Sequence, residues 1–281
     1  MDVATAVEKQ MWSNTAVINV WKDYAISWIL YGLWRNGLWH ALVLKGGTCL
    51  RKAYYQNYRL SIDLDYTTNV SFDVNQLYEG VVDALQITLD KSPVRFITEN
   101  VSIKKRIGKR YHTGEFLGYQ ITIPFTPPRR WRSTKPVISM DITLEKYEKI
   151  FLATPTKSLF HPYNDGFSHI LTKTKMRTYS LEEIFAEKIR SLYQRVRVRD
   201  LYDLWFLRND VNMGVVRYIL PKKFEMKDIT YNISEIYDKK LKFRDGWNRY
   251  LRDFVREIPP FEDVWDSVMD TISMIFQEHE R

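Results

Sequence analysis

Two aspartates separated by one residue are the side chains in the sequence best placed for metal chemistry. Asp63 and Asp65 fall in residues 61–66, where polar and apolar side chains alternate. Alternation is typical of a strand with one buried face, so both carboxylates should project from the other face, with Cα atoms about 6.5–7 Å apart. Such carboxylates repel unless a proton or cation lies between them, and Mg²⁺ takes oxygen ligands from carboxylates and substrate phosphates. The alternative is a solvated strand face that carries two unrelated acids.

A glycine turn precedes this strand. Lys45, Gly46, Gly47 and Thr48 follow a short apolar run, and 14 residues separate Thr48 from Asp63. Glycines let backbone N–H groups approach a ligand, and a helix that starts at Thr48 would favour an anion at its N-terminus. Thr48 could cap that helix or contact a phosphate. The spacing does not match a Walker loop, and a Gly-Gly-Thr turn alone is usually only a turn, but together with the strand it can place a phosphate and a metal in one cleft.

A third carboxylate is expected from a later strand. In residues 137–144, apolar side chains alternate with Ser139, Asp141 and Thr143. Asp141 is therefore the one acid on a strand face otherwise filled by hydroxyl groups. We predict that it joins Asp63 and Asp65 as a metal ligand. The alternative is a solvent-facing acid on an antiparallel edge strand.

Charged residues also fall on apolar helix faces in the second half of the chain. The segment Ser-Leu-Glu-Glu that begins at Ser180 is a capping box, and Lys188 lies on the apolar stripe of the helix that it predicts. A lysine there needs a partner or a functional role, and it could reach a triphosphate or a carboxylate, or extend past the core into water. Asp203 lies among core positions of the next helix, with Lys188 or an arginine as its nearest partner, and Asp200 could be the N-cap of that helix.

The positive charge of the chain is concentrated in one window. Of 42 Lys+Arg and 34 Asp+Glu, nine basic residues and one acid fall in residues 103–135, so the other 33 basic residues are balanced by 33 acids. Aromatic side chains are interleaved with this charge, which suits a phosphate backbone and unstacked bases. The alternative is a solvated hairpin that keeps the protein soluble. The basic residues of this window are Lys104, Lys105, Arg106, Lys109, Arg110, Arg129, Arg130, Arg132 and Lys135.

The elements that must position these residues indicate an α+β fold. Periodicity predicts helices over residues 5–39 and 74–90, and several strands between 94 and 144. Farther along, strand signals are scarce and helices dominate. We predict an N-terminal domain of residues 1–155, with a mixed sheet and helices, and a helical C-terminal domain of residues 156–281 that completes the active-site cleft.

Composition excludes several classes of protein. The chain of 281 residues is 45% hydrophobic and 27% charged, which is typical of a globular protein. Its single cysteine excludes an internal disulfide framework and a cysteine-based zinc site. The apolar stretch at residues 24–34 is too short to span a bilayer, and no basic segment of a signal peptide precedes it. We therefore expect a cytoplasmic protein without membrane association.

Three blocks of sequence resemble one family. Residues 44–48, residues 59–65, and residues 180–188 together with 199–204 are similar, in order and spacing, to the AbiEii family of nucleotidyltransferase toxins and the related MenT toxins. These families belong to the DNA polymerase β-like nucleotidyltransferase superfamily. The resemblance covers about residues 40–210. It implies a polymerase β-like nucleotidyltransferase domain followed by a helical domain.

The resemblance also implies partners and roles. Members are toxins of two-gene toxin–antitoxin (type IV-like) or phage-defence systems, so it implies a cognate antitoxin, an NTP substrate and Mg²⁺. MenT relatives add nucleotides to tRNA acceptor ends. The family glycine motif often has Ser where Thr48 stands, and the late aspartate could be either of two residues. By position, Gly47 and Thr48 match the glycine motif, and Ser61, Asp63 and Asp65 match the metal motif. Lys188 matches the catalytic lysine, and Asp200 or Asp203 matches the late aspartate.

The expected reaction is Mg²⁺-dependent transfer of a nucleotide to an RNA 3′ end, with the tRNA acceptor stem as the expected acceptor and a block of translation as the result. Asp63, Asp65 and Asp141 would hold one or two Mg²⁺, residues 45–48 and Ser61 would bind the NTP, and Lys188 would offset charge on the leaving pyrophosphate. Three alternatives stay open: a metal-dependent nuclease, transfer to a protein hydroxyl, and a non-catalytic module that binds RNA or an antitoxin.

Overall fold

The computed structural model divides into two compact units. Unit 1 comprises Met1–Tyr147 and Thr154–Thr178, and unit 2 comprises Glu148–Ala153 and Tyr179–Arg281. Unit 1 contains the sheet and unit 2 is helical, so the predicted α+β class is confirmed. The structure describes residues 3–9, 11, 16–108, 114–128 and 135–277.

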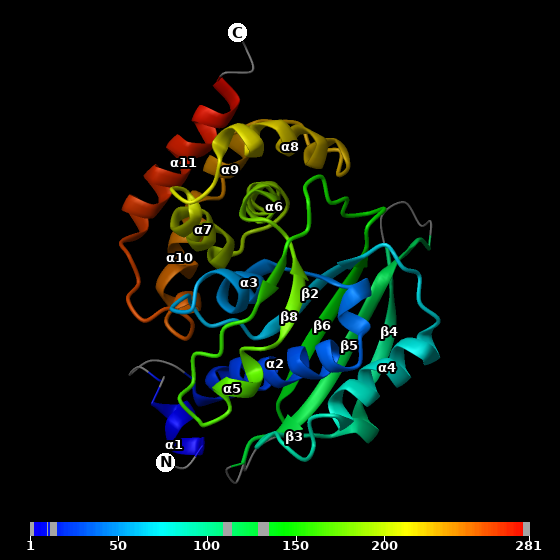
Figure 1. Ribbon diagram of the computed structural model, residues 1–281. Helices are drawn as coiled ribbons and strands as arrows, with labels where there is room; N and C mark the ends of the chain where they lie inside the picture. Colours follow the sequence, from blue (N-terminus) through cyan, green and yellow to red (C-terminus); the bar gives the residue numbers. More distant parts are fainter. Residues whose placement is uncertain (1–2, 10, 12–15, 109–113, 129–134, 278–281) are drawn as a thin grey trace. The chain divides into compact units, whose positions relative to one another are not determined.

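Unit 1 is built on a mixed sheet (Figure 1). Within the described residues the sheet has eight strands in the order β3-β5-β6-β2-β1-β8-β7, and β4 also pairs with β5. The pairs β2–β6 and β1–β8 are parallel, and the other pairs are antiparallel. The strands are β1 (Val43–Lys45), β2 (Asp63–Thr68), β3 (Arg95–Phe96), β4 (Ser102–Ile107), β5 (Phe116–Thr126), β6 (Val137–Leu144), β7 (Thr156–Ser158) and β8 (Lys175–Thr178).

Two long helices, α2 (Val17–Arg35) and α4 (Val74–Gln86), pack against each other in unit 1 and lie across the sheet (Figure 1). They approach closely because Gly32 has no side chain: a Cβ there would lie 2.0 Å from the carbonyl oxygen of Ala84. The single helix predicted over residues 5–39 is wrong, because α1 (Val3–Glu8) is separate from α2. The short elements of unit 1 are η1 (Leu38–Ala41), α3 (Gly46–Cys49), η2 (Leu50–Tyr54), η3 (Thr98–Asn100) and α5 (Ser168–Leu171).

Unit 2 is a set of packed helices. Helix α6 packs against α7 and α8, and α11 packs against the same two helices, with Leu204, Ile219 and Trp265 buried among them. No helix in the described part of the chain has the length and apolar character needed to cross a membrane. The helices are α6 (Leu181–Gln194), α7 (Val198–Leu207), α8 (Met213–Glu225), α9 (Ser234–Tyr237), α10 (Lys240–Leu251) and α11 (Phe261–Gln277).

The division between the units differs from the predicted boundary at residues 155 and 156. Thr154–Thr178 belongs to unit 1, because its last four residues form β8, which pairs with β1. Glu148–Ala153 belongs to unit 2, where the backbone N–H groups of Phe151 and Leu152 donate to the Glu183 carboxylate. The segment of residues 148–178 is thus shared between the units, whereas the prediction divided the chain at a single point.

Candidate active site

Two of the predicted carboxylates face each other across neighbouring strands. Asp65 of β2 is the Cα partner of Asp141 of β6. Asp63 lies two residues before Asp65, and both are half-buried while Leu64 between them is buried. Directly paired residues, and residues two apart on a strand, have side chains on the same face of a sheet. The three carboxylates therefore share one face, as predicted, and Asp141 is not on an edge, since β6 lies between β5 and β2.

The pairing extends into a row across five strands. Lys104, Gln120, Asp141, Asp65 and Lys45 are successive Cα partners on β4, β5, β6, β2 and β1. The two carboxylates stand in the middle of this row, and a lysine stands at each end. Gln120 was not among the predicted site residues, because only strand pairing brings it next to Asp141.

The environment of Asp141 disfavours its negative charge. The net shift of the Asp141 pKa is upward. Burial raises the pKa most, and the charges of Asp65 and Asp63 raise it further. The charge of Arg106 and a hydrogen bond from Gln120 lower it, but by less. One oxygen, Oδ1, is buried and has no hydrogen-bond partner within the described residues. A buried acceptor without a partner is costly, so this oxygen suits a ligand that supplies positive charge.

The glycine turn lies directly against the Asp65 carboxylate. Gly46 has a φ of +70°, which favours glycine, and a Cβ at this position would lie 3.1 Å from Asp65 Oδ2. At Gly47, a Cβ would lie 2.7 Å from Nη2 of the buried Arg59. Neither residue can carry a side chain without displacing a charged group. Arg59 belongs to a block that carries the family resemblance, but its place behind the turn was not predicted.

Thr48 has a different role from the predicted helix cap. Helix α3 begins at Gly46 with Lys45 as its N-cap residue, so Thr48 lies inside the helix. The Thr48 hydroxyl donates to the backbone carbonyl of Asp63 and lies 2.8 Å from Ser61 Oγ. Thr48 and the buried Ser61 thus fasten the glycine turn to the start of β2, and both lie beside the predicted metal strand.

The residues on this face fit a hard divalent cation. No group of three or more His, Cys, Asp or Glu side chains in the described ranges has the geometry to hold a metal by itself. However, Asp65 and Asp141 are paired, and the partnerless Oδ1 of Asp141 is a ready oxygen ligand. Mg²⁺ is commonly held by one or two carboxylates together with substrate phosphates rather than by a cage of protein ligands. The donor set matches that arrangement.

A further lysine of unit 1 lies near these carboxylates. Lys22 of α2 is half-buried; burial lowers its pKa, and the charge of Asp63 acts in the opposite direction. Lys22 is therefore close enough to Asp63 to respond to its charge. Helical periodicity gave no signal for this residue, because its relation to Asp63 depends on how α2 packs against the sheet.

In unit 2, Lys188 contacts both late aspartates. Its Nζ lies 2.5 Å from Asp200 Oδ1 and 2.7 Å from Asp203 Oδ2. Ser191 donates to the other Asp200 oxygen at 2.7 Å. Burial alone would raise the pKa of Asp200, but the charges of Lys188 and Arg195 outweigh it and hold the pKa below its usual value. The predicted partner of Asp203 is confirmed, whereas Asp200 is not an N-cap, because α7 begins two residues before it.

The basic residues of the window 103–135 lie on different faces of the sheet. Lys104 and Arg106 lie on the carboxylate face, and the Arg106 guanidinium donates to Thr143 Oγ1 at 3.2 Å. Lys105 points to the opposite face, with its Nζ 5.7 Å from the centroid of the Phe116 ring. Lys135 is exposed next to β6. The other predicted RNA-binding residues, Lys109, Arg110, Arg129, Arg130 and Arg132, lie outside the described residues.

Comparison with known families identifies the chain. A family model described as nucleotidyl transferase AbiEii toxin of the type IV toxin–antitoxin system matches residues 28–269. The chain belongs to the AbiEii family. It is therefore a nucleotidyltransferase toxin of a type IV toxin–antitoxin system, as the resemblance indicated, and AbiEii membership implies an NTP substrate, a divalent metal and a cognate antitoxin. A comparison with curated proteins gives no match.

Solved structures share the fold of this AbiEii chain. MenT4, a nucleotidyltransferase toxin from Mycobacterium tuberculosis, matches with a TM-score of 0.56 and 17% identity, over 97% of this chain and 88% of its own. JHP933 from Helicobacter pylori matches with a TM-score of 0.51 and 16% identity, over 95% of both chains. At such low identity the likeness establishes the fold alone, and it confirms the predicted nucleotidyltransferase architecture.

Proposed function

We propose that this toxin uses Mg²⁺ to transfer a nucleoside monophosphate from an NTP to an RNA 3′ hydroxyl, and that Asp65 and Asp141 form the centre of the site. The observation that carries the proposal is their direct pairing across β2 and β6, with an Asp141 oxygen on the same face that has no partner in the described part of the chain. The glycine turn that lies against Asp65 adds a place for the phosphates. Asp63 completes the acidic group as the third carboxylate.

Each residue of the site has a defined role in this proposal. Bound Mg²⁺ would neutralise phosphate charge and lower the pKa of the attacking hydroxyl. Asp63, Asp65 and Asp141 would hold the metal. The backbone N–H groups of the turn, at the start of α3, would bind phosphate oxygens. Lys45, at the end of the carboxylate row, adds positive charge for the triphosphate. The RNA 3′ hydroxyl would lose its proton, its oxygen would form a bond to the α-phosphorus, and the bond from that phosphorus to pyrophosphate would break.

RNA is the acceptor that the charge distribution supports best. The entire positive excess of the sequence lies in residues 103–135, and Lys104 and Arg106 of that window share the carboxylate face. Cations beside the reacting centre can bind the phosphates of an incoming strand. We take the tRNA acceptor stem as the specific acceptor, with blocked translation as the consequence, and phage defence as a context in which such a toxin would act.

The contribution of unit 2 is a separate part of the proposal. We assign Lys188 to charge compensation on the pyrophosphate, with Asp200 and Asp203 as the residues that hold its ammonium group. Lys188→Ala should then reduce transfer at saturating NTP, because a group that acts on the leaving charge lowers kcat. Lys188→Arg tests whether charge alone is sufficient.

The central test is transfer of label from each radiolabelled NTP to total RNA. We expect the wild-type protein to label RNA of tRNA size and Asp65→Asn to label none, while Asp83→Asn, the same change at an exposed acid of α4, keeps full activity. Full labelling by Asp65→Asn would contradict the assignment. Three other outcomes would favour the alternatives: RNA fragments released without NTP (nuclease), label on protein (protein acceptor), or no binding of NTP (non-catalytic module).

A further inference from the structure

A buried polar cluster lies in unit 1 behind the glycine turn. Asp23 of α2 has no exposed surface, and its carboxylate contacts three groups: Arg51 Nε at 2.7 Å, Lys52 Nζ at 2.9 Å and the Tyr163 hydroxyl at 2.6 Å. Asp23 and its three partners thus come from three distant parts of the sequence. None of them has a role in the reaction proposed above.

Two members of the cluster belong to the helical segment that follows the glycine turn. Arg51 and Lys52 lie in η2, a π-helical turn that directly follows α3, the helix that begins at Gly46. Arg51 also donates through Nη1 to the carbonyl of Tyr58, in the segment that leads to Ser61 and β2. The Asp23 carboxylate is therefore connected, through one guanidinium, to both segments that form the candidate active site.

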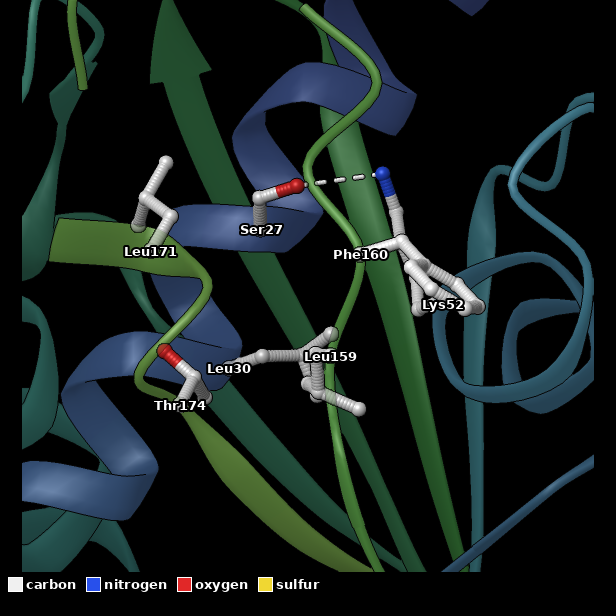
Figure 2. A pocket seen from close by; sticks show the side chains of 7 residues that line it. All are labelled: Ser27, Leu30, Lys52, Leu159, Phe160, Leu171 and Thr174. Carbon is white, nitrogen blue, oxygen red and sulfur yellow. Dashed lines mark hydrogen bonds between the residues drawn. The ribbon is translucent and has the colours of Figure 1, made fainter. Parts of the chain in front are cut away.

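Lys52 is held without freedom to exchange its partners. Its ammonium group has three hydrogens, and it contacts three acceptors: the Asp23 carbonyl at 2.9 Å, Asp23 Oδ2 at 2.9 Å and Ser27 Oγ at 3.0 Å. Figure 2 shows the Lys52 side chain directed at Ser27 beside the apolar Leu30 and Leu159. The space that these side chains line is too small to admit a water molecule.

We propose that Asp23 is a positioning residue of the active site, which holds the glycine turn and the start of β2 in the relative placement that nucleotidyl transfer requires. This inference rests on the proposed function, since it takes the Asp65 face as the reacting centre. A buried ion network is weak evidence for stability by itself, and its best-attested use is to fix one arrangement of the groups that it joins. Here the joined groups are the phosphate-binding turn and the metal strand.

The cluster gives this role a pH signature. Burial would raise the pKa of Asp23, but Arg51 and Lys52 outweigh it and lower the pKa to about 2. Burial and the charge of Arg51 lower the pKa of Lys52 to about 8, although the charge of Asp23 acts to raise it. The other titratable groups near Lys52 are Tyr163 and His161. Above pH 8 the Lys52 amine has two hydrogens for three acceptors, so the turn is held less firmly.

The test compares Asp23→Asn with Asp165→Asn in the full chain. We expect Asp23→Asn to raise the KM for NTP about tenfold and to lower kcat/KM about a hundredfold, because small misplacements of reacting groups cost that much. The alkaline limb of its pH–rate profile should also move below pH 8, because Lys52 loses the charge that raises its pKa. Asp165 is a buried carboxylate of the same unit whose bonds go to Tyr24 and His161 instead. Asp165→Asn should lower the melting temperature without changing the KM for NTP.

Tyr163→Phe provides a second variant if Asp23→Asn does not fold. It keeps the ring and removes one hydrogen bond to Asp23, and we expect a threefold or larger rise in the KM for NTP. A wild-type KM and an unmoved alkaline limb in folded Asp23→Asn and Tyr163→Phe would overturn the inference. If Asp65→Asn is inactive in the same assay, the proposed function would still stand. An active Asp65→Asn would overturn the proposed function, and the inference with it.

Discussion

At the scale of single residues, Gly46 shows how backbone conformation and site chemistry meet. Its positive φ is accessible to other residues only with strain, and its missing side chain leaves the Asp65 carboxylate within reach of the turn. In the proposed site the turn would offer N–H groups to an anion, and the carboxylate would offer oxygens to a cation. A triphosphate with a bound metal is a ligand with both requirements.

Gly46→Ala should separate these two effects from each other. A left-handed non-glycine residue costs about 1–2 kcal/mol, and the added Cβ would in addition press on Asp65 Oδ2. We expect a loss of stability of that size and a fall in kcat/KM of about a hundredfold. Gly37→Ala is the matched control, since its φ is +84° and no atom lies within 4 Å of its added Cβ. Urea unfolding should show a destabilisation at Gly46 at least as large as that at Gly37. NTP transfer should be lost only at Gly46, and equal activity in both variants would refute the argument.

Without a bound metal, the protein should be less stable with Asp141 than with the uncharged asparagine at the same position. Its pKa is raised in the folded state, so the ionised carboxylate is less favourable there than in the unfolded chain, and its contribution to stability falls as the pH rises above its ordinary value of 3.8. We expect Asp141→Asn to raise the melting temperature at pH 7 in a chelating buffer, by about 2 °C or more, and to abolish transfer. Added Mg²⁺ should stabilise the wild type and not the variant. A variant that is less stable than wild type in chelator would contradict this.

At the scale of elements, the sequence correctly predicted the segments whose own residues show a full strand or helix pattern. Strand β6 spans the predicted residues 137–144, because its alternation is unbroken. Helix α6 starts after Ser180, whose Oγ accepts from the Glu183 N–H at 3.2 Å as the capping box requires. The second half of that box is absent, since the Glu183 carboxylate accepts from the backbone of residues 151 and 152 instead.

The elements that sequence reasoning missed depend on distant partners. The four residues of β8 show too little alternation to be recognised, and they form a strand because β1 lies beside them. The Asp23 cluster joins residues 28, 29 and 140 positions apart, and no local spacing connects them. The row from Lys104 to Lys45 likewise follows from strand order, which the periodicity of single strands does not contain.

Helix α8 offers a test of how α6 is held in unit 2. Lys223 is buried and pairs with Glu183 at 2.5 Å and Glu187 at 2.7 Å. Its removal leaves buried negative charge uncompensated, so Lys223→Ala should destabilise the protein by about 3–5 kcal/mol. Lys222→Ala removes the neighbouring lysine, whose ammonium lies over the exposed Tyr218 ring and 5.8 Å from the Phe151 ring centroid, and should cost about 1 kcal/mol or less. Chemical unfolding of both variants measures the difference, and similar costs would show that the buried pair contributes little.

At the scale of the whole molecule, the net charge of +8 is a property of one window of the sequence. The strand geometry of β4 divides that charge further, because successive side chains point to opposite faces. Lys104 shares the carboxylate face, and Lys105 lies on the other. A ligand drawn by net charge alone would not distinguish the two lysines, whereas an RNA strand that crosses the carboxylate face would.

RNA binding measured against salt concentration can make that distinction. Each phosphate contact contributes about 0.7–0.9 to the slope of log affinity against log salt, so losing one contact lowers the slope by about 1. We expect Lys104→Ala to lower the slope by that amount and to raise the KM for RNA, with the KM for NTP unchanged. Lys105→Ala removes the same charge from the same strand and should keep the slope and the KM for RNA. Equal changes in both variants would show that the window acts as a diffuse positive field, and the proposed path of the RNA across the carboxylate face would then be wrong.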